Sequence, residues 1–321
     1  MRLKGGCMAL GQQLVHPDCL AFVAVVEELL ARRQQGLVPQ NRWQLADDPW
    51  GPRAWNRTEL EDMVYSSYKQ MRKGRITRPP RREVVMDIAD YLNCTIEERN
   101  RLLIAADGSP IMPYLTGAAL TPILEITIEI VQQLSMPAFV INRDWQMHYF
   151  NEHLLNLFGV TPEMLAAIDP TQLNVLGLLC NPDLPLYPQL IQNRASWQFM
   201  VRKTIYGFKQ ANVLCQYEPW YQQLVAELLQ LPEFASQWPT VSLDKPLVTP
   251  NMGLESPTIV LEALIPHTKP MPKRAWLRPL LMSAGYFQFD FPQIVAFLPA
   301  NAESQAIYAE IGVPLGINHS N

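Results

Sequence analysis

The sequence lacks an uninterrupted apolar run of the length that crosses a lipid bilayer, about 18 residues or more. Its first residues, MRLKGGCMALGQQL, also lack the apolar core of a secretory signal peptide. Cysteine is scarce, and the five cysteines are scattered and odd in number, which favours thiols in a reducing compartment over a disulfide framework. These features predict a soluble, cytoplasmic protein without a membrane span.

Motifs of common catalytic sites are missing as well. The sequence has no G-x-S-x-G elbow, no H-E-x-x-H zinc helix, no Walker phosphate loop and no G-x-G-x-x-G fingerprint, and its acids are scattered. We therefore expect no enzymatic activity and no cofactor. Cys7, His16 and Cys19 are residue types that can bind a metal, but no second ligand pair follows them. Their spacing is therefore more simply read as chance, and no metal site is expected.

Glycine is sparse, at 15 residues, whereas 28 prolines indicate many fixed turns and short elements. Apolar residues make up 48% of the 321 positions, enough for a sizeable core, and the length favours two domains. Residues 1–107 carry sixteen basic and fourteen acidic side chains, whereas the remainder carries ten and sixteen. An anionic partner is therefore expected at the N-terminal part.

Helical periodicity and capping signals dominate the first 106 residues, so an all-α domain is expected there. Asn56 is a candidate helix cap, Gly74 a stop signal, and Thr95 with Glu98 matches a capping box. The expected helices span 19–35, 57–73, 81–92 and 95–107. The apolar stripe of the first is predicted to include Leu20, Val23, Leu29 and Leu30.

The stretch SYKQMRKGRITRPPRR, residues 67–82, has seven basic side chains and no acid. A helix that ends at Lys73 and continues as an extended basic arm suits a row of phosphates. The alternative is a solvated face at a helix C-terminus, where cations are favourable anyway. The DNA-binding candidates are Arg57, Lys69, Arg72, Lys73, Arg75, Arg78, Arg81 and Arg82.

A turn-rich linker spans residues 107–117, and residues 120–134 are either a helix or an extended connector. Two short strands follow Pro137, with a turn at 142–144, then helices capped by Asn151 and Thr161. Longer helices are expected around 189–212 and 219–231, and strands return in TIVLEALI, YFQFDF and QIVAFL. This order predicts an α+β domain with an antiparallel sheet over 137–311, after a connector at 107–136 and before a tail at 312–321.

Aromatic side chains in this second domain are candidates to line an apolar cavity between sheet and helices, although ordinary core packing is the simpler reading for any single one. Arg194, Arg202 and Lys203 are candidate partners for a ligand carboxylate, with Arg202 preferred, although each is more simply read as a surface cation. The ligand-binding candidates are Phe139, Trp145, Tyr149, Phe158, Trp197, Phe199, Arg202, Phe208 and Phe289.

Two stretches carry family resemblances. YKQMRKGRITRPPRREVVMDIADYLNCTIEERNRLLIAA resembles the second half of an Xre/Cro-like helix-turn-helix domain, over about residues 57–106. MPAFVINRDWQMHYFNEHLLNLFG, NVLGLLCNPDLPLYP, LVAELLQLPEFASQW and QIVAFLPANAESQ resemble, in order, the MmyB-like ligand-binding domain, which is PAS-like, over about 120–311.

These resemblances imply a transcription regulator that binds duplex DNA and a small apolar ligand, with a fatty acid as the candidate bound molecule. A homodimer is a further candidate, because helix-turn-helix proteins commonly bind two half-sites. The rival interpretations are a protein-interaction module with a degenerate helix-turn-helix, and a haem- or flavin-sensing PAS protein.

Overall fold

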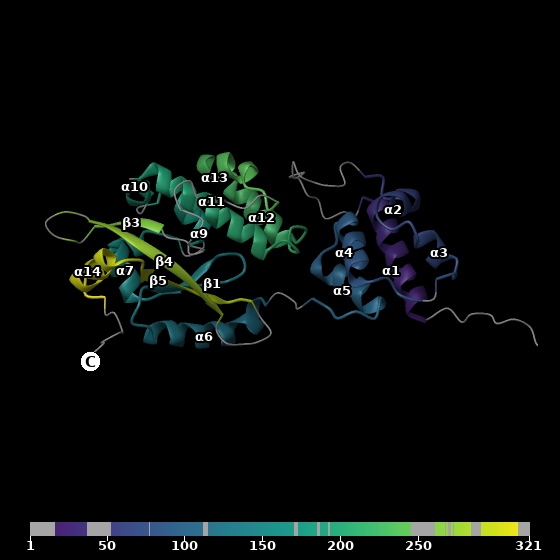
Figure 1. The fold of residues 1–321 in the computed structure, drawn as a ribbon, viewed down its shortest axis with the longest axis horizontal. Helices are drawn as coiled ribbons and strands as arrows, with labels where there is room; N and C mark the ends of the chain where they lie inside the picture. Colours follow the sequence, from purple (N-terminus) through teal and green to yellow (C-terminus); the bar gives the residue numbers. More distant parts are fainter. Residues whose placement is uncertain are drawn as a thin grey trace, which may run out of the picture. The chain divides into compact units, whose positions relative to one another are not determined.

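The chain divides into two compact units, and the main boundary falls between residues 113 and 114. The first unit is helical and the second combines helices with an antiparallel sheet, which confirms this part of the predicted fold class (Figure 1). The structure is a computed structural model. It describes residues 17–36, 53–76, 78–111, 115–169, 173–184, 187–191, 193–244, 261–266, 268, 271, 273–283 and 290–313. No helix in these ranges is long and apolar enough to cross a membrane.

In the described part of the first unit, helix ends follow the capping signals in the sequence. The Asn56 side chain accepts a hydrogen bond from the backbone N–H of Glu59 at 2.8 Å, and Thr95 and Glu98 form the expected capping box. Gly36 ends the first helix with a φ of 77°, a conformation that glycine adopts without strain. The helices are α1 (Pro17–Gln34), α2 (Arg57–Met63), α3 (Tyr68–Arg72), α4 (Arg82–Tyr91) and α5 (Ile96–Ala105).

The predicted single helix over 57–73 is wrong, because residues 64–67 form a turn between α2 and α3. The backbone N–H groups of Val64 and Tyr65 both donate to the carbonyl of Leu60, which closes α2. Val64 and the two serines that follow Tyr65 are weak helix formers, and serine side chains compete for backbone hydrogen bonds. After the turn, Tyr68 and Met71 are fully buried in the core of this unit.

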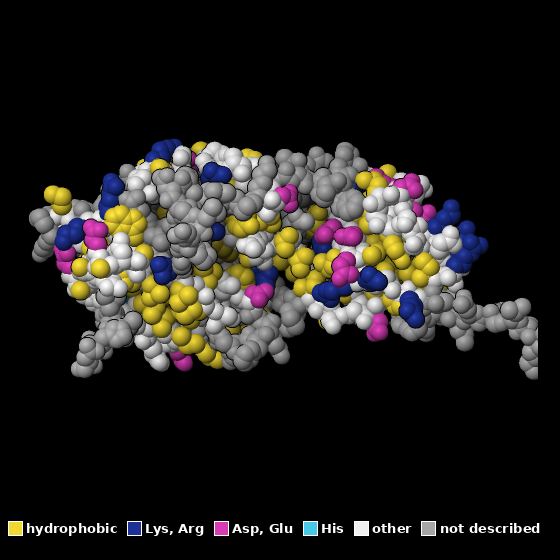
Figure 2. All heavy atoms as spheres, in the orientation of Figure 1, with side chains coloured by type: hydrophobic (Ala, Val, Ile, Leu, Met, Phe, Trp, Pro, Cys, Tyr) yellow, Lys and Arg dark blue, Asp and Glu magenta, His cyan; other side chains and the backbone are white. Residues whose placement is uncertain are grey.

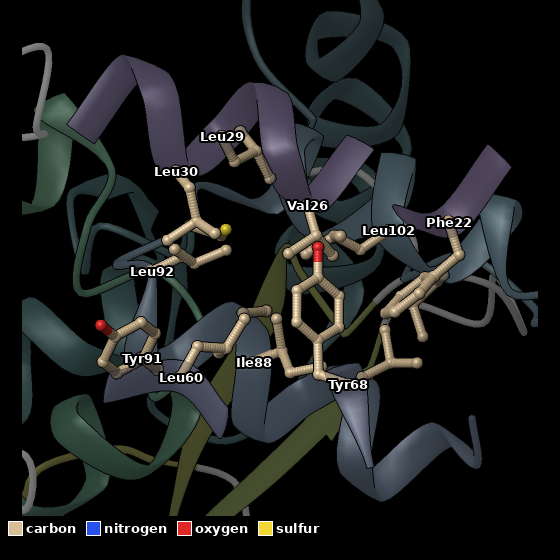
Figure 3. Packing of buried hydrophobic residues seen from close by; sticks show 14 of the residues in the cluster. Phe22, Val26, Leu29, Leu30, Leu60, Tyr68, Ile88, Tyr91, Leu92 and Leu102 are labelled. Carbon is tan, nitrogen blue, oxygen red and sulfur yellow. The ribbon is translucent and has the colours of Figure 1, made fainter. Parts of the chain in front are cut away.

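The core of the first unit lies between α1 and the other four helices. Phe22, Val26, Leu29 and Leu30 follow the spacing of one helical face and are buried, whereas Leu20, predicted to be in this stripe, is 55% exposed. Figure 3 shows these α1 side chains opposite residues of α2 to α5. The partners labelled there are Leu60, Tyr68, Ile88, Tyr91, Leu92 and Leu102.

A buried arginine ties the end of α1 to the α4–α5 junction. The Arg33 guanidinium donates to the carbonyl of Leu92 at 2.7 Å and to the Glu98 carboxylate at 2.5 Å. Arg33 is 2% exposed and Glu98 is 6% exposed, so this ion pair is held away from water. Because Glu98 also closes the capping box of α5, one carboxylate satisfies a helix start and a buried cation together.

The second unit is built on five described strands in the order β2-β1-β5-β4-β3, all antiparallel. The strands are β1 (Ala138–Ile141), β2 (Met147–Phe150), β3 (Leu261–Ile265), β4 (Lys273–Ser283) and β5 (Gln293–Pro299). The helices are α6 (Gly117–Gln133), α7 (Glu152–Phe158), α8 (Pro162–Ala166), α9 (Val175–Cys180), α10 (Tyr187–Leu190), α11 (Arg194–Ala211), α12 (Pro219–Leu228), α13 (Pro232–Gln237) and α14 (Ala302–Glu310), with a short 3₁₀ helix η2 (Trp238–Thr240).

Alternation along β1 and β5 separates the two faces of this sheet. One face presents small or β-branched residues to α6, and the open alternative over 120–134 is a helix. The other face presents larger side chains toward α7 and α14. Facing α6 are Ala138, Val140, Ile294 and Ala296, and on the other face are Phe139, Ile141, Val295 and Phe297.

The sequence prediction missed β4 and α14 and expected a strand over 286–291, of which 286–289 lie outside the described residues. Pro279 within β4 argues against a strand, because proline cannot donate to the ladder. The described part of β3 pairs with β4 only from Lys273 to Leu277, so on that side Pro279 has no described strand neighbour. Its other side pairs with Phe297 of β5. The missing N–H therefore leaves the described ladder intact.

The buried Arg33–Glu98 pair generates a stability prediction. Arg33→Met removes the buried donor to the Leu92 carbonyl and leaves the Glu98 carboxylate with only the more exposed Arg32, at 3.3 Å, so the free energy of unfolding should fall by about 3 kcal/mol. Arg101→Met, which removes an exposed pair with Glu28, should cost less than about 1 kcal/mol. Urea unfolding followed by far-ultraviolet circular dichroism measures both. Equal losses in the two variants would contradict the role of the buried pair.

Candidate functional site

A cavity of about 660 Å³ lies in the second unit, against the sheet face that carries the larger side chains. Its lining residues come from the sheet and from helices that include α7, α9 and α11. Figure 1 shows where these helices and the strands lie. Its volume is in the range of small-molecule pockets, and most of its lining is aliphatic or aromatic. The wall includes Phe139, Ile141, Trp145, Phe150, Leu154, Phe158, Leu178, Trp197, Met200, Thr204, Gly207, Leu277, Val295 and Phe297.

Four of the predicted ligand-binding aromatics lie on this wall: Phe139, Trp145, Phe158 and Trp197. The others that the structure describes lie elsewhere, and Phe289 lies outside the described residues. Tyr149 packs on the α6 face, because it pairs with Val140 rather than with Phe139.

Phe208 and Phe199 belong to α11 but are not part of the described lining. Phe208 is fully buried behind the wall. Its ring stacks on that of Tyr221, with 5.2 Å between the ring centres, and makes a T-shaped contact with Trp145, with 6.0 Å between the centres. Phe199 is half-buried. Both residues therefore support the packing around α11 rather than the surface of the cavity.

The charged side chains of the described lining are Lys203 and Arg274, and no carboxylate lies among them. Arg202, the predicted partner of a ligand carboxylate, is exposed and outside the lining. Successive residues on a helix point about 100° apart, so the side chain that reaches the cavity is the next one, Lys203. The cavity is thus apolar with a cationic contribution from α11 and β4.

The β1–β2 turn places Trp145 on the cavity wall by an uncommon backbone conformation. Its φ is 63°, in the left-handed region that bulky residues rarely adopt. The backbone N–H of Trp145 donates to the carbonyl of Asn142 at 2.8 Å, and that of Asn142 donates to Gln146. In a three-residue hairpin loop of this type the left-handed position usually holds glycine, and a tryptophan there costs about 1–3 kcal/mol.

Three neighbouring carbonyls of this turn are held by other elements. Asn212, at the end of α11, donates to the carbonyl of Arg143 at 3.1 Å. Asn174, which caps α9, donates to the carbonyl of Asp144 at 2.7 Å, and the Val175 N–H donates to that of Trp145 at 3.0 Å. These contacts over-determine the turn and offset the strain at Trp145.

Gly207 on α11 has no side chain and so leaves space for the Trp145 indole. A Cβ atom at this position would come within 3.3 Å of the Trp145 Cη2 atom, closer than most real contacts. The sequence signal for this arrangement was only the turn at 142–144. Nothing in the sequence linked Trp145 to Gly207, Asn174 or Asn212, because those contacts join distant parts of the chain.

The basic side chains of the first unit gather beside α3, where Figure 2 shows a dark-blue cluster at one end of the unit. The structure places most of the predicted DNA-binding side chains in solvent and Arg72 half in the interior. The exposed ones are Arg57, Lys69, Lys73, Arg75, Arg78, Arg81 and Arg82.

Glu27 of α1 engages two of these cations. Its carboxylate accepts from Arg57 Nε at 2.7 Å and lies 3.7 Å from Arg72, and it also accepts from the Tyr68 hydroxyl at 3.0 Å. Burial, reinforced by the Glu27 charge, raises the pKa of Tyr68, so its hydroxyl stays protonated and donates. Arg57 therefore links α2 to α1 and Arg72 links α3 to α1, which leaves Lys69 of α3 and Lys73 at its C-cap as outward cations.

The described cysteines do not form a reactive site. Cys19, Cys94, Cys180 and Cys215 are buried and form no disulfide. Burial raises the pKa of Cys94 and of Cys180 to about 12, so both thiols stay protonated and weakly nucleophilic at neutral pH.

Comparison with protein families identifies one part of the chain. Residues 127–258 match the MmyB-like transcription regulator ligand binding domain. The matched range runs from α6 past η2, so it contains the β1–β2 turn and the cavity helices α7, α9 and α11. The MmyB-like resemblance is thereby confirmed over this range, whereas the helix-turn-helix resemblance of the first unit stays a prediction. No curated protein matches the chain.

The geometry of the second unit generates a prediction about its cavity. The apolar dye N-phenyl-1-naphthylamine should bind with enhanced fluorescence, because the cavity removes it from water. Thr204→Phe places a ring in the lining and should weaken dye binding at least tenfold. Arg202→Phe adds the same ring two residues earlier, outside the lining, and should bind as the parent does. Equal dye affinity in both variants would show that the dye binds elsewhere.

Proposed function

We propose that the chain is a transcription regulator whose first unit binds duplex DNA and whose second unit binds an apolar, fatty-acid-like ligand that changes DNA affinity. The observation that carries this proposal is the apolar cavity inside the region that matches the MmyB-like transcription regulator ligand binding domain. A family of regulators with a ligand-binding domain supports the two partners, DNA and ligand, rather than an enzyme.

The DNA-binding part of the proposal is supported by the arrangement of α2 and α3. A four-residue turn, 64–67, joins the two helices, which is the connection length of a helix-turn-helix unit. α3 presents Lys69, Gln70 and Lys73 to solvent, and the exposed arginines of residues 75–82 continue the basic surface. Lysine and arginine on such a surface release counterions from phosphates, whereas polar side chains of the second helix are placed to reach base edges.

The ligand-binding part is supported by the balance of the cavity lining. Burial of each methylene of an acyl chain contributes about 0.8 kcal/mol, and the aliphatic and aromatic wall supplies that burial. A buried carboxylate without a partner is costly, and Lys203 and Arg274 provide the opposite charge. The described lining contains no histidine or cysteine, the proximal haem ligands of globins and P450s, although it does contain Met147, Met200 and Tyr206.

A homodimer remains part of the proposal. Ile126 and Ile130 of α6 are 39% and 37% exposed and supply apolar surface on the helix that follows the first unit. Two copies of α3 spaced by a dimer would fit the half-site arrangement that helix-turn-helix proteins use.

The basic face of α3 generates a prediction for DNA binding. The double variant Lys69→Ala, Lys73→Ala should reduce the slope of log K against log salt concentration by about two, one for each lost phosphate contact. Fluorescence anisotropy with a labelled duplex over a salt series measures this slope. The double variant Arg194→Ala, Lys273→Ala removes the same charge from the second unit and should leave the slope unchanged. Equal slopes in the two double variants would place the DNA contact elsewhere.

A further inference from the structure

One buried asparagine joins three elements of the second unit. Asn151 follows β2, caps α7 and is 3% exposed. Its Oδ1 atom accepts from the backbone N–H of Leu154 in α7 at 3.0 Å and from that of Ala138, at the start of β1, at 3.1 Å. Its Nδ2 atom donates to carbonyls at the end of α6 and just beyond it, and the shortest of these bonds is to Met136 at 2.8 Å. The same amide therefore starts α7, holds β1 and satisfies carbonyls that a helix end leaves without partners.

The elements that Asn151 joins lie on opposite faces of the sheet. α7 belongs to the cavity wall through Leu154, Leu155 and Phe158. α6 packs on the other face, and none of its described residues lines the cavity. α6 is also the helix with which the chain enters the second unit, because the boundary between the units falls at residues 113–114. A ligand in the cavity thus contacts α7 directly and reaches α6 only through the elements that hold it.

The packing of α6 on the sheet is apolar and offers little to lock the helix in place. The strands present the small side chains of Ala138 and Ala296 to it, and packed helices can slide on one another or on a sheet by small shear movements. Thr121 and Thr127 of α6 bond back to carbonyls of their own helix. Among the described residues, Asn151 supplies the side-chain hydrogen bonds that fix α6 to the rest of the unit.

We propose that Asn151 couples the cavity to α6, so that a ligand which displaces α7 shifts the end of α6. A movement of α7 carries its N-cap residue with it, and the amide of that residue holds the carbonyls of α6. Asn151 itself is outside the described lining, so it is a positioning residue that acts through α7. The inference rests on the proposed ligand-controlled DNA binding and deepens it, because it names the link by which the ligand acts.

Hydrogen–deuterium exchange of the full chain tests the link without DNA. Dodecanoate serves as an acyl-chain probe of the cavity and is added to saturation after removal of co-purified lipid. The exchange rate of peptides within 126–136 should change at least threefold, although the described part of α6 does not line the cavity. Unchanged exchange there in a parent that binds dodecanoate would overturn the proposal, and this outcome needs no variant.

Asn151→Ser separates the link from the cap. Serine caps a helix about as well as asparagine, so α7 keeps its start, but serine lacks the NH2 group that reaches α6. The exchange response of 126–136 should disappear, and dodecanoate affinity should stay within threefold of the parent. A parent-like response in Asn151→Ser would overturn the proposal.

Asn174→Ser is the matched control. Asn174 is also buried, caps the cavity helix α9 and donates to a carbonyl, that of Asp144, but it does not contact α6. This variant should keep the exchange response of the parent. Loss of the response in both variants would show that general loosening carries the effect, and would contradict a specific link through Asn151.

The ratio of DNA dissociation constants without and with saturating dodecanoate gives the second readout. It should change at least fivefold in the parent and in Asn174→Ser, and less than twofold in Asn151→Ser. If α6 responds in the parent while the ratio stays at one, the coupling within the second unit holds and the proposed control of DNA binding fails. If neither dodecanoate nor N-phenyl-1-naphthylamine binds the parent, the proposed ligand-binding function fails, and the coupling fails with it.

Discussion

The fold of the second unit depends on helices that cover both faces of one short antiparallel sheet and pack on them differently. On one face, alanines at 138 and 296 let α6 pack directly on the strands. On the other face, Phe139 and Phe297 stand in the same two strands, pack with residues of α7 and α14, and also line the cavity. Because alternation gives each strand one small and one large face, the close packing on one side and the cavity on the other follow from the same pattern.

This arrangement gives up stability to keep a cavity open. An apolar cavity forgoes the contacts that a filled core would have, and the turn at Trp145 adds backbone strain. Asn174 and Asn212 compensate by holding the carbonyls around Trp145, so the turn is tied to α9 and α11. The elements that hold the turn therefore also line the cavity, and a ligand that contacts the indole or α11 acts on them directly.

The sequence alone predicted the local features well. The caps at Asn56 and Thr95 act within one helical turn, so their residue types suffice to place helix ends. Phe139 and Trp197 were also predicted as cavity-lining residues, and strand alternation and helix periodicity are local patterns that bear on such a prediction.

Features that depend on helix phase or tertiary context escaped the sequence prediction. Arg202 and Lys203 were both candidates, and choosing between them required the rotational phase of α11, because successive residues point about 100° apart. The break between α2 and α3 depends on the burial of Tyr68. The strand through Pro279 depends on which residues of β4 the described part of β3 pairs with. The contact of Trp145 with Gly207 joins residues about 60 positions apart, a separation at which no local pattern acts.

The central claim is that occupancy of the cavity changes DNA affinity, and a ligand does so only if its affinity differs between two states of the protein. The most direct measurement is the DNA dissociation constant of the delipidated chain at fixed salt, with and without saturating dodecanoate, for the parent and for Thr204→Phe. The account predicts at least a fivefold change in the parent, the lower end of allosteric coupling, and none in Thr204→Phe. An unchanged constant in a parent shown to bind dodecanoate would contradict it.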